Sequence, residues 1–132
     1  MSADDRYKLA LDHFEKSLAR LKESLARSED EFMRDSIIQR FEFTFETAWK
    51  AMYRWLRKRG NDVDEEAYSV IPAAFERRLI SDVKAWGDMR KARNKTSHTY
   101  DQDIALEVAA FARHQSVALF EALLETLRGR TE

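Results

Sequence analysis

The sequence predicts an all-α protein, an up-and-down four-helix bundle with one additional short helix, in a single domain over residues 1–132. Three observations lead to this fold class. Only three of the 132 residues are glycine and one is proline, so few positions interrupt a helix. Apolar residues make up 44% of the chain and charged residues 36%, which is typical of helices with one buried and one solvated face. The apolar residues also recur at helical spacing, and the length suits one hydrophobic core.

Two long helices are predicted in the first half of the chain. The first runs from about Asp4 to Arg27, because its apolar residues recur at alternating steps of four and three. Its apolar stripe consists of Tyr7, Leu11, Phe14, Leu18, Leu21 and Leu25. A capping-box pattern of Ser28 and Glu31 predicts the start of the second helix, which continues to about Arg59 and ends at Gly60-Asn61.

The second helix has more apolar residues than one stripe can hold, so we expect it to pack on two sides as the central helix. Its aromatic residues include Phe41, Phe43, Phe45, Trp49 and Trp55. Such side chains can stack on nucleic-acid bases, but at helical spacing in a bundle they more often form the core or a dimer interface. We therefore predict a core or interface role for this cluster.

A short helix and a longer one are predicted after a polar connection over residues 61–70. Pro72 suits the first turn of the short helix, which should end near Ile80. Ser81-Asp82 then provides an N-cap for a helix that runs from about Val83 to Lys95 or Ser97.

The last helix is predicted to begin at Thr99, because Gln102 follows three residues later in a second capping-box pattern. Asp101 and Asp103 add negative charge near the positive end of the helix dipole. The apolar residues of this helix include Ile104, Val108, Phe111, Leu119, Leu123 and Leu127. A break in the helical chain is therefore expected just before Thr99.

The composition excludes several classes of chemistry. The chain has no cysteine and only three histidines, so we expect no metal site, no cofactor and no thiol chemistry. His13 and His114 have no ligand at metal-binding spacing and are expected to be surface residues. The sequence shows no signal peptide and no apolar run near the roughly 18 residues that a membrane span needs, so a cytoplasmic location is expected.

The most reactive side chains are concentrated in residues 93–100, at the end of the helix predicted from Val83. Arg93 follows Trp86 and Met89 on the same helix face, so it ends a stripe of core residues. A buried guanidinium without a partner is costly, so Arg93 must either reach a carboxylate or face a wet cleft that accepts an anion. His98 lies five residues further on, and a helix end near Ser97 would let it turn back toward Arg93.

These groups suit metal-independent cleavage of an RNA phosphodiester. That reaction requires removal of the 2′-hydroxyl proton, protonation of the leaving 5′-oxygen and stabilisation of charge at phosphorus. Histidine suits the proton transfers because it titrates near neutral pH, and arginine suits the phosphate because its planar fork donates two charge-assisted hydrogen bonds. One histidine does not readily act as base and acid in the same turnover. This favours a two-fold dimer in which each chain supplies an Arg93 and a His98.

The charge around this segment favours a polyanionic ligand. Between Asp82 and His98, five basic residues stand against two acidic ones, a local excess of about +3 in a chain of net charge -1. The candidates for additional RNA contacts are Arg90, Lys91 and Lys95.

Each reactive residue also has a structural interpretation. Arg93 could pair with Glu42 or Glu46 of the central helix, and such a carboxylate could also orient the guanidinium for phosphate. His98 could cap a helix C-terminus, and Tyr100 could be a half-buried packing residue.

The spacing of Arg93, His98 and Tyr100 resembles the R-x4-H-x-Y signature of the HEPN ribonucleases, specifically the HepT-like toxins encoded beside a minimal nucleotidyltransferase. Asn94 directly after the arginine, the aromatic segment 41–50 and the five-helix layout are similar to the branch named nucleotidyltransferase substrate-binding proteins. The resemblance covers nearly the whole chain. Asn94 is interpreted as a supporting residue, with a structural role such as C-terminal capping.

The resemblance implies an all-helical homodimer whose two motifs face each other across a cleft, with Arg93 and His98 as the RNA-cleaving residues. It also implies a cognate nucleotidyltransferase, encoded nearby, that acts as antitoxin and transfers AMP from ATP to Tyr100. A bulky anion at Tyr100 would block the phosphate site by charge and volume. The older family name implies a different role, a noncatalytic subunit that helps its nucleotidyltransferase to bind substrate. The residues alone do not choose between these roles, and a plain structural bundle is the third interpretation.

Overall fold

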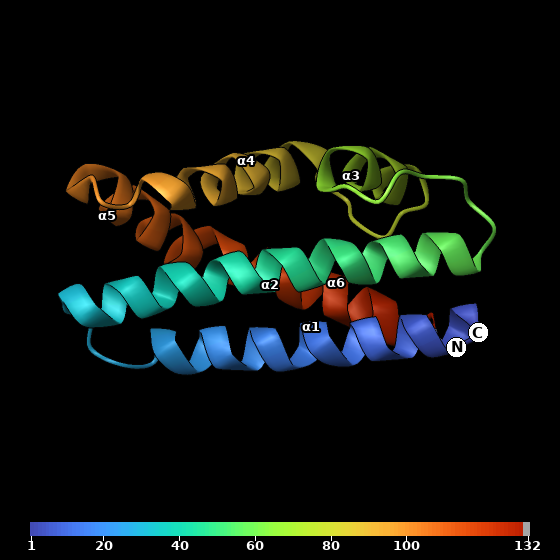
Figure 1. Ribbon diagram of the computed structural model, residues 1–132, viewed down its shortest axis with the longest axis horizontal. Coiled ribbons are helices and arrows are strands. Elements are labelled where there is room, and N and C mark those ends of the chain that lie inside the picture. The colour runs from blue at the N-terminus through green and yellow to red at the C-terminus, as the bar shows by residue number, and fades with distance from the viewer. Residues whose placement is uncertain (131–132) are drawn as a thin grey trace.

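The protein is an all-helical bundle over residues 1–130, the part of the chain that the computed structural model describes. Residues 131–132 of the predicted domain lie outside the described residues. The helices are α1 (Ala3–Leu25), α2 (Glu31–Lys58), α3 (Ala67–Glu76), α4 (Val83–Asn94), α5 (Gln102–Phe111) and α6 (Val117–Gly129). These residues contain no strand, so the predicted fold class is confirmed (Figure 1). No helix in residues 1–130 combines the length and apolar character required to cross a membrane.

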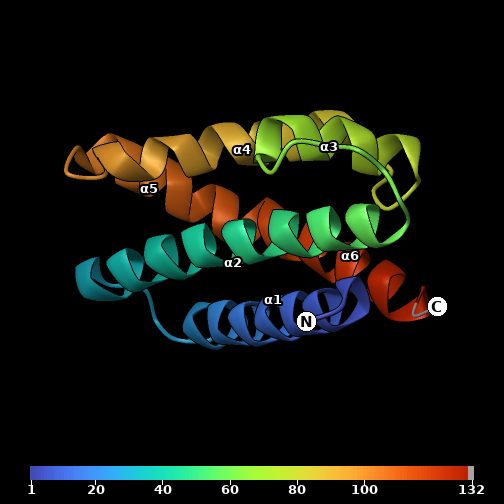
Figure 2. The same ribbon diagram turned by 45° about the vertical axis from the view of Figure 1, so that its right-hand side comes forward.

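Helix α2 lies at the centre of the bundle, as predicted. Helix α1 runs antiparallel along one side of α2, while α3 and α4 lie on the opposite side (Figures 1 and 2). Helix α6 crosses behind α2 in both views. The turn from α4 to α5, which contains the reactive segment, lies at the end of the bundle where α2 begins.

The aromatic residues of α2 form the middle of the core. Four of the five predicted aromatic residues are buried, namely Phe41, Phe45, Trp49 and Trp55. Phe41 packs against Phe111 with ring centroids 6.1 Å apart, and Phe45 lies 6.4 Å from Trp86 of α4. Phe43 differs, since it is 54% exposed on the surface of α2. The predicted core role is thus confirmed for these four residues, while an interface role stays a prediction for Phe43.

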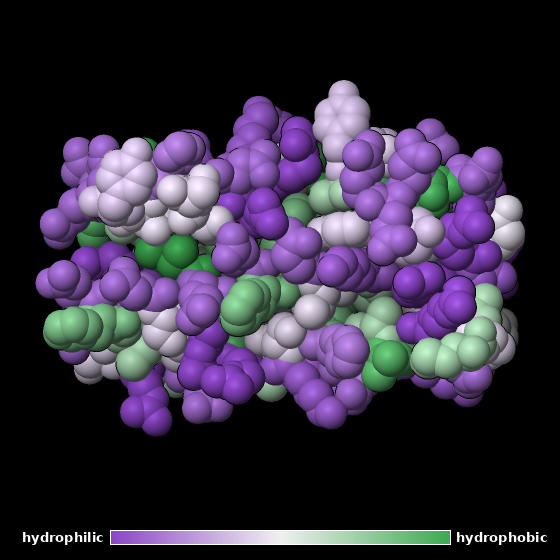
Figure 3. Space-filling model, viewed as in Figure 1, coloured by the Kyte–Doolittle hydropathy of each residue, from purple (hydrophilic) through white to green (hydrophobic). Residues whose placement is uncertain are grey.

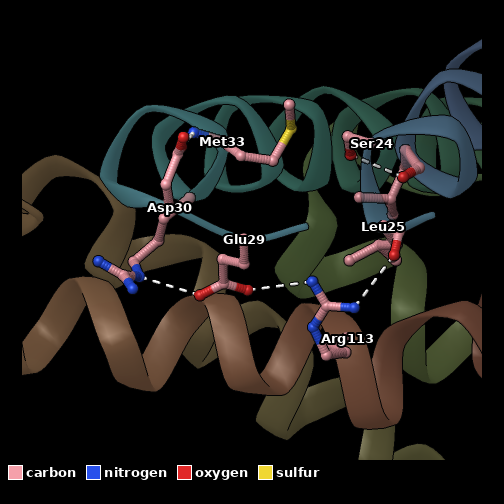
Figure 4. Close-up of polar contacts among 8 residues, drawn as sticks. Ser24, Leu25, Glu29, Asp30, Met33 and Arg113 are labelled. Atoms are coloured by element: carbon pink, nitrogen blue, oxygen red, sulfur yellow. Dashed lines mark hydrogen bonds and ion pairs between the residues drawn. The ribbon is translucent and has the colours of Figure 1, made fainter. Parts of the chain in front are cut away.

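The second predicted helix, α2, begins later than predicted. Asp30 is the N-cap of α2, and its carboxylate accepts a hydrogen bond from the backbone N–H of Met33 at 2.7 Å. The predicted cap at Ser28 is wrong. The chain before Asp30 is held instead by Glu29, whose carboxylate accepts a hydrogen bond from Arg113 at 3.0 Å (Figure 4). This tertiary contact fixes the link and moves the helix start two residues beyond Ser28.

Helix α3 begins earlier than predicted. It starts at Ala67, so Pro72 lies inside the helix and not in its first turn. Val70, which the sequence placed in a polar connection, is buried in the core. The burial of this helix face outweighs the cost of the proline, whose own side is exposed to solvent.

The end of α3 also differs from the prediction. The helix ends at Glu76, whereas the sequence predicted an end near Ile80. Arg78 then adopts a left-handed backbone conformation with φ 61°, and the N–H of Leu79 donates to the carbonyl of Ala74 at 2.9 Å. This turn closes the helix in the way a glycine usually does, and an arginine gives no sequence signal for it.

The last predicted helix is a continuous helical segment in which the π-helical stretch Ala112–Ser116 joins α5 to α6. The Ser116 hydroxyl donates to the Ala112 carbonyl at 2.6 Å within this stretch. Asp101 is the N-cap of α5, because its carboxylate accepts a hydrogen bond from the N–H of Asp103 at 2.9 Å. The predicted cap at Thr99 is wrong, since its hydroxyl donates to a carbonyl of the preceding turn.

Candidate functional site

The reactive segment lies where the α-helical geometry of α4 changes. Helix α4 has Asp82 as its N-cap, as predicted, and a 3-10 turn (Lys95–His98) follows its last residue, Asn94. Helix α4 therefore ends one residue before the earlier of the two predicted ends, Lys95 and Ser97, and the 3-10 turn covers the residues in between. The tighter turn changes the direction in which the side chains after Asn94 point. The side chain of His98 therefore does not lie where a continued α-helix would place it.

Arg93 contacts a carboxylate of the central helix. Its Nη2 lies 2.7 Å from Oε1 of Glu46, so Glu46 is its partner and Glu42 is not. The other oxygen of Glu46 accepts a hydrogen bond from the indole N–H of Trp49 at 3.1 Å. The buried Nε of Arg93 has no hydrogen-bond partner among residues 1–130, while the side chain is 35% exposed. The guanidinium is therefore held on one side and has donor capacity left for an anion.

Glu42 binds a different part of the segment. Its carboxylate accepts a hydrogen bond from the Thr96 hydroxyl at 2.7 Å, and that hydroxyl also lies 2.7 Å from the carbonyl oxygen of Arg93. Glu42 and Glu46 are one turn apart on α2, so two adjacent carboxylates hold the end of α4. Thr96 and Trp49 are supporting residues that were not predicted from the sequence. Trp49 follows Glu46 by three residues, a spacing at which two side chains of one helix can meet.

His98 and Tyr100 lie beside each other on the surface. Their ring centroids are 6.1 Å apart in an edge-to-face arrangement. Tyr100 is 87% exposed, so the half-buried packing role considered for it is wrong. Within residues 1–130 the exposed His98 side chain forms no hydrogen bond, either to Arg93 or to a helix end. One chain therefore brings His98 to Tyr100 and does not join it to Arg93.

The other predicted contact residues lie around the end of α4 in different environments. Asn94 is exposed at the last position of the helix, and Lys91 is exposed one turn earlier. The ammonium group of Lys95 binds a glutamate of α5 at 2.9 Å, which offsets part of its charge. The guanidinium of Arg90 lies over the ring of Tyr68, 5.1 Å from its centroid. Lys91 is thus the candidate whose charge is most open to a ligand.

This arrangement can bind an anion and transfer a proton. Arg93 offers oriented donors, and the exposed imidazole of His98 can exchange protons with a ligand or with water. The side chain of Tyr100 is exposed to solvent. Within residues 1–130, no hydrogen bond joins this imidazole to the guanidinium.

Comparison with known proteins identifies relatives along most of the chain. The family model described as "Nucleotidyltransferase substrate binding protein like" matches residues 6–129. A protein of Haemophilus influenzae with the name "Probable ribonuclease HepT" is 37% identical over 100 residues, which cover 72% of this chain and 67% of that protein.

Two solved structures share the fold. A crystal structure of a Thermus thermophilus protein is 34% identical, with a TM-score of 0.71, and the match covers 90% of this chain and 98% of that one. A second structure, from Haemophilus influenzae, is described as revealing the fold of a substrate binding domain of a nucleotidyltransferase. It is 27% identical, with a TM-score of 0.68, and the match covers 95% of this chain and 98% of that one.

Proposed function

Because the chain belongs to the HepT-like family of nucleotidyltransferase substrate-binding proteins, we propose that it is the endoribonuclease toxin of a toxin-antitoxin pair. In this proposal it cleaves RNA without a metal, through paired Arg93 and His98 residues across a homodimer. A minimal nucleotidyltransferase is its antitoxin partner. The name of the Haemophilus influenzae relative supports the ribonuclease activity, and the position of Arg93 supports the chemistry.

The proposed reaction is an internal transfer at phosphorus. The imidazole of one His98 takes the proton of the 2′-hydroxyl, and the 2′-oxygen forms a bond to phosphorus. The bond from phosphorus to the 5′-oxygen breaks, and the His98 of the second chain gives a proton to that oxygen. The products are a 2′,3′-cyclic phosphate and a 5′-hydroxyl. Arg93 binds the phosphate oxygens, whose negative charge increases during the transfer.

The observation that most strongly supports this proposal is the environment of Arg93. Glu46 binds one nitrogen of the guanidinium at 2.7 Å, and Trp49 in turn donates a hydrogen bond to Glu46. The Arg93 side chain is nevertheless 35% exposed, so the donors that Glu46 does not use are open to a phosphate oxygen.

The distribution of proton-transferring groups supports the proposed homodimer. No hydrogen bond joins His98 to Arg93 within residues 1–130, and one imidazole does not readily serve as both base and acid in a single turnover. A two-fold axis that brings two copies of the segment together supplies both groups. This places two arginines and two histidines around one phosphodiester.

Tyr100 is the proposed regulatory residue. Its hydroxyl is accessible at 87% exposure, and its ring lies 6.1 Å from that of His98. Transfer of AMP by the nucleotidyltransferase joins the tyrosine oxygen to the α-phosphorus of ATP and releases pyrophosphate. The attached phosphate and adenosine would repel an RNA phosphate and fill the space beside His98.

Incubation of the purified chain with RNA in EDTA tests the ribonuclease proposal. We expect cleavage with 2′,3′-cyclic phosphate ends by the unchanged chain, and a loss of at least about 100-fold in His98→Ala and Arg93→Ala. His114→Ala is the matched control, because His114 is an exposed histidine of the π-helical stretch and is not part of the proposed motif. Cleavage by His98→Ala at the rate of the control would contradict the assignment.

A second candidate function is supported by the family description itself. A noncatalytic subunit would bind the substrate of the nucleotidyltransferase, as the names of the family and of the second Haemophilus structure indicate for those proteins. In that case RNA stays intact in the same assay. The chain would co-purify with the nucleotidyltransferase and lower the KM of that enzyme for its substrate.

A further inference from the structure

A concave surface lies between α1 and the second half of α2. Its wall includes Arg6, Leu9, Lys50, Tyr53 and Arg54, and its volume is about 360 Å³. We call this surface the α1–α2 groove. It is separate from the Arg93 contact, but Thr47 at its edge follows Glu46 directly in the chain.

The cations of the groove lack carboxylate partners. Arg6, Lys50 and Arg54 form no salt bridge within residues 1–130, and Glu65 is the one acidic residue on the wall. Neighbouring basic side chains are paired, for example Lys8 with Asp4 at 3.0 Å. Figure 3 shows that this face of the bundle is mainly hydrophilic, with apolar side chains exposed between the polar ones. The uncompensated positive charge therefore gathers at the groove and favours an anionic ligand.

The groove also offers apolar and aromatic surface. Leu9 is 45% exposed, and the half-buried ring of Tyr53 has the guanidinium of Arg54 5.3 Å from its centroid. Grooves that bind single-stranded nucleic acid combine cations for the backbone with aromatic rings and arginine planes for the bases. The volume of the groove suits one or two nucleotides and is too small for a duplex.

The direction of α2 connects the groove to Arg93. Lys50 follows Glu46 by one helical turn, about 6 Å along the axis, and Arg54 follows by two turns on the same side of the helix. A polynucleotide with one phosphate at Arg93 would therefore meet Lys50 and Arg54 as it continues along α2.

We propose that the α1–α2 groove binds the single-stranded RNA that flanks the cleaved phosphodiester, with Arg6, Lys50 and Arg54 on its phosphates and Tyr53 beneath a base. This inference rests on the proposed ribonuclease function and adds a binding track to it. His13, which was predicted to be a surface residue, also lines the groove.

The test measures RNA affinity in the His98→Ala background, where RNA stays intact. Fluorescence anisotropy with RNA of about three and about nine nucleotides is recorded over a range of salt concentrations. The double variant Arg6→Gln, Lys50→Gln removes two phosphate contacts, so the slope of log affinity against log salt should fall by about 1.4 for the longer RNA. The short RNA, which reaches only Arg93, should bind with an unchanged slope. Tyr53→Leu should weaken binding of the longer RNA without changing the slope.

The matched control is Arg27→Gln, Arg59→Gln, which removes the same charge from exposed arginines outside the groove. Equal slopes for the groove variant and this control would overturn the groove inference, while the cleavage assay with His98→Ala would still decide the ribonuclease proposal. If the groove variant bound RNA normally but no longer retained the nucleotidyltransferase, the groove would be a binding site for that partner protein. This result would overturn the inference. A change of molar mass in light scattering would assign the groove to the dimer interface, with the same consequence.

Discussion

The guanidinium of Arg93 and the carboxylate of Glu46 lie 2.7 Å apart and join the end of α4 to the middle of the central helix. The indole N–H of Trp49 fixes the second oxygen of the same carboxylate at 3.1 Å. The carboxylate of Glu46 is therefore oriented in the absence of a ligand. Because it binds the guanidinium of Arg93, it also orients that group. This is the arrangement expected of a positioning residue behind a phosphate-binding group.

Glu46→Gln should impair cleavage more than folding. The amide keeps the volume of the side chain but loses the charge-assisted hydrogen bond that orients Arg93. We expect kcat to fall about tenfold, which corresponds to about 1.4 kcal/mol in the barrier, with a smaller change in KM. Steady-state cleavage assays and thermal unfolding measure the two effects.

The control for Glu46→Gln is the same substitution at Glu107, the exposed α5 partner of Lys95. That variant loses an exposed ion pair and should cleave at close to the original rate. If Glu46→Gln cleaved as fast as Glu107→Gln, the Arg93 contact would be a structural ion pair without a role in positioning.

Mixed dimers should show that both copies of the segment act together. The double variant Arg93→Ala, His98→Ala is expected to fold and to form dimers with the unchanged chain, because both side chains are partly or largely exposed. If cleavage needs both segments, a large excess of the variant should reduce activity per unchanged chain to below about one tenth. Activity that stays constant per unchanged chain after subunit exchange would show that one segment is sufficient.

Much of the fold follows from apolar spacing and helix-stop residues. The stripe of α1, the two-sided packing of α2 and the end of α4 before His98 were all predictable, because local periodicity and burial agree there. The partner of Arg93 was reduced to Glu42 or Glu46 by the same argument. Both lie on the correct face of α2, and only the rotational position of α4 against α2 decides between them.

The helix starts were less predictable, because capping patterns compete. Ser28 and Asp30 are both suitable N-cap residues, and so are Thr99 and Asp101. In each case the structure uses the aspartate closer to the helix. Thr99 donates its hydroxyl to the carbonyl of Thr96 instead, and the link that contains Ser28 is held through Glu29. The left-handed conformation of Arg78 and the π-helical stretch depend on tertiary packing and have no local signal.

Tyr7→Phe should test a buried hydrogen bond between the two ends of the chain. The Tyr7 hydroxyl donates to the carbonyl of Leu127 at 3.1 Å, and its removal should cost about 1 kcal/mol of unfolding free energy near pH 7. Burial, together with the negative charge of Asp4, raises the pKa of Tyr7 to about 12 from 10.0. Because the folded pKa is the higher one, the unfolded chain loses this proton first, and stability is lost as the pH rises from about 10 to 12.

Urea unfolding at neutral and alkaline pH measures both effects of Tyr7→Phe. The unchanged chain should lose about 2 kcal/mol more than the variant between pH 10 and 12. Tyr68→Phe is the control, since Tyr68 is 70% exposed. If Tyr7→Phe and the unchanged chain lost the same unfolding free energy between pH 10 and 12, the fold would not raise the pKa of the Tyr7 hydroxyl.

Glu29→Gln should remove an acid-sensitive contact between the α1–α2 link and the π-helical stretch. Burial alone would raise the pKa of Glu29, but hydrogen bonds from Arg113 and Arg34 outweigh it and hold this pKa below its usual value of 4.5. The contact therefore stabilises the fold above about pH 4.5 and is lost as the pH falls through the lower folded pKa. We expect Glu29→Gln to cost about 1 kcal/mol at pH 7, or about 4 °C in Tm, and a smaller cost as the pH falls below about 4.5.

Glu15→Gln is the control for this pH dependence, because Glu15 pairs with Arg128 at an exposed position. It should change Tm little at either pH, since exposed pairs contribute little to stability. A Tm difference between Glu29→Gln and the unchanged chain that stayed constant from pH 7 to pH 3 would assign the effect to packing and not to the charge of Glu29.

Tyr100→Phe should separate regulation from catalysis. The Tyr100 side chain is 87% exposed, so loss of its hydroxyl should change unfolding free energy by less than about 0.5 kcal/mol. RNA cleavage should remain, because the proposed chemistry uses Arg93 and His98. After co-expression with the nucleotidyltransferase, mass spectrometry should find adenylylated Tyr100 in the unchanged chain and in Tyr68→Phe, but no adenylylated tyrosine in Tyr100→Phe. If Tyr100→Phe were still modified and inhibited, the acceptor would be another residue, and the proximity of Tyr100 to His98 would have no regulatory meaning.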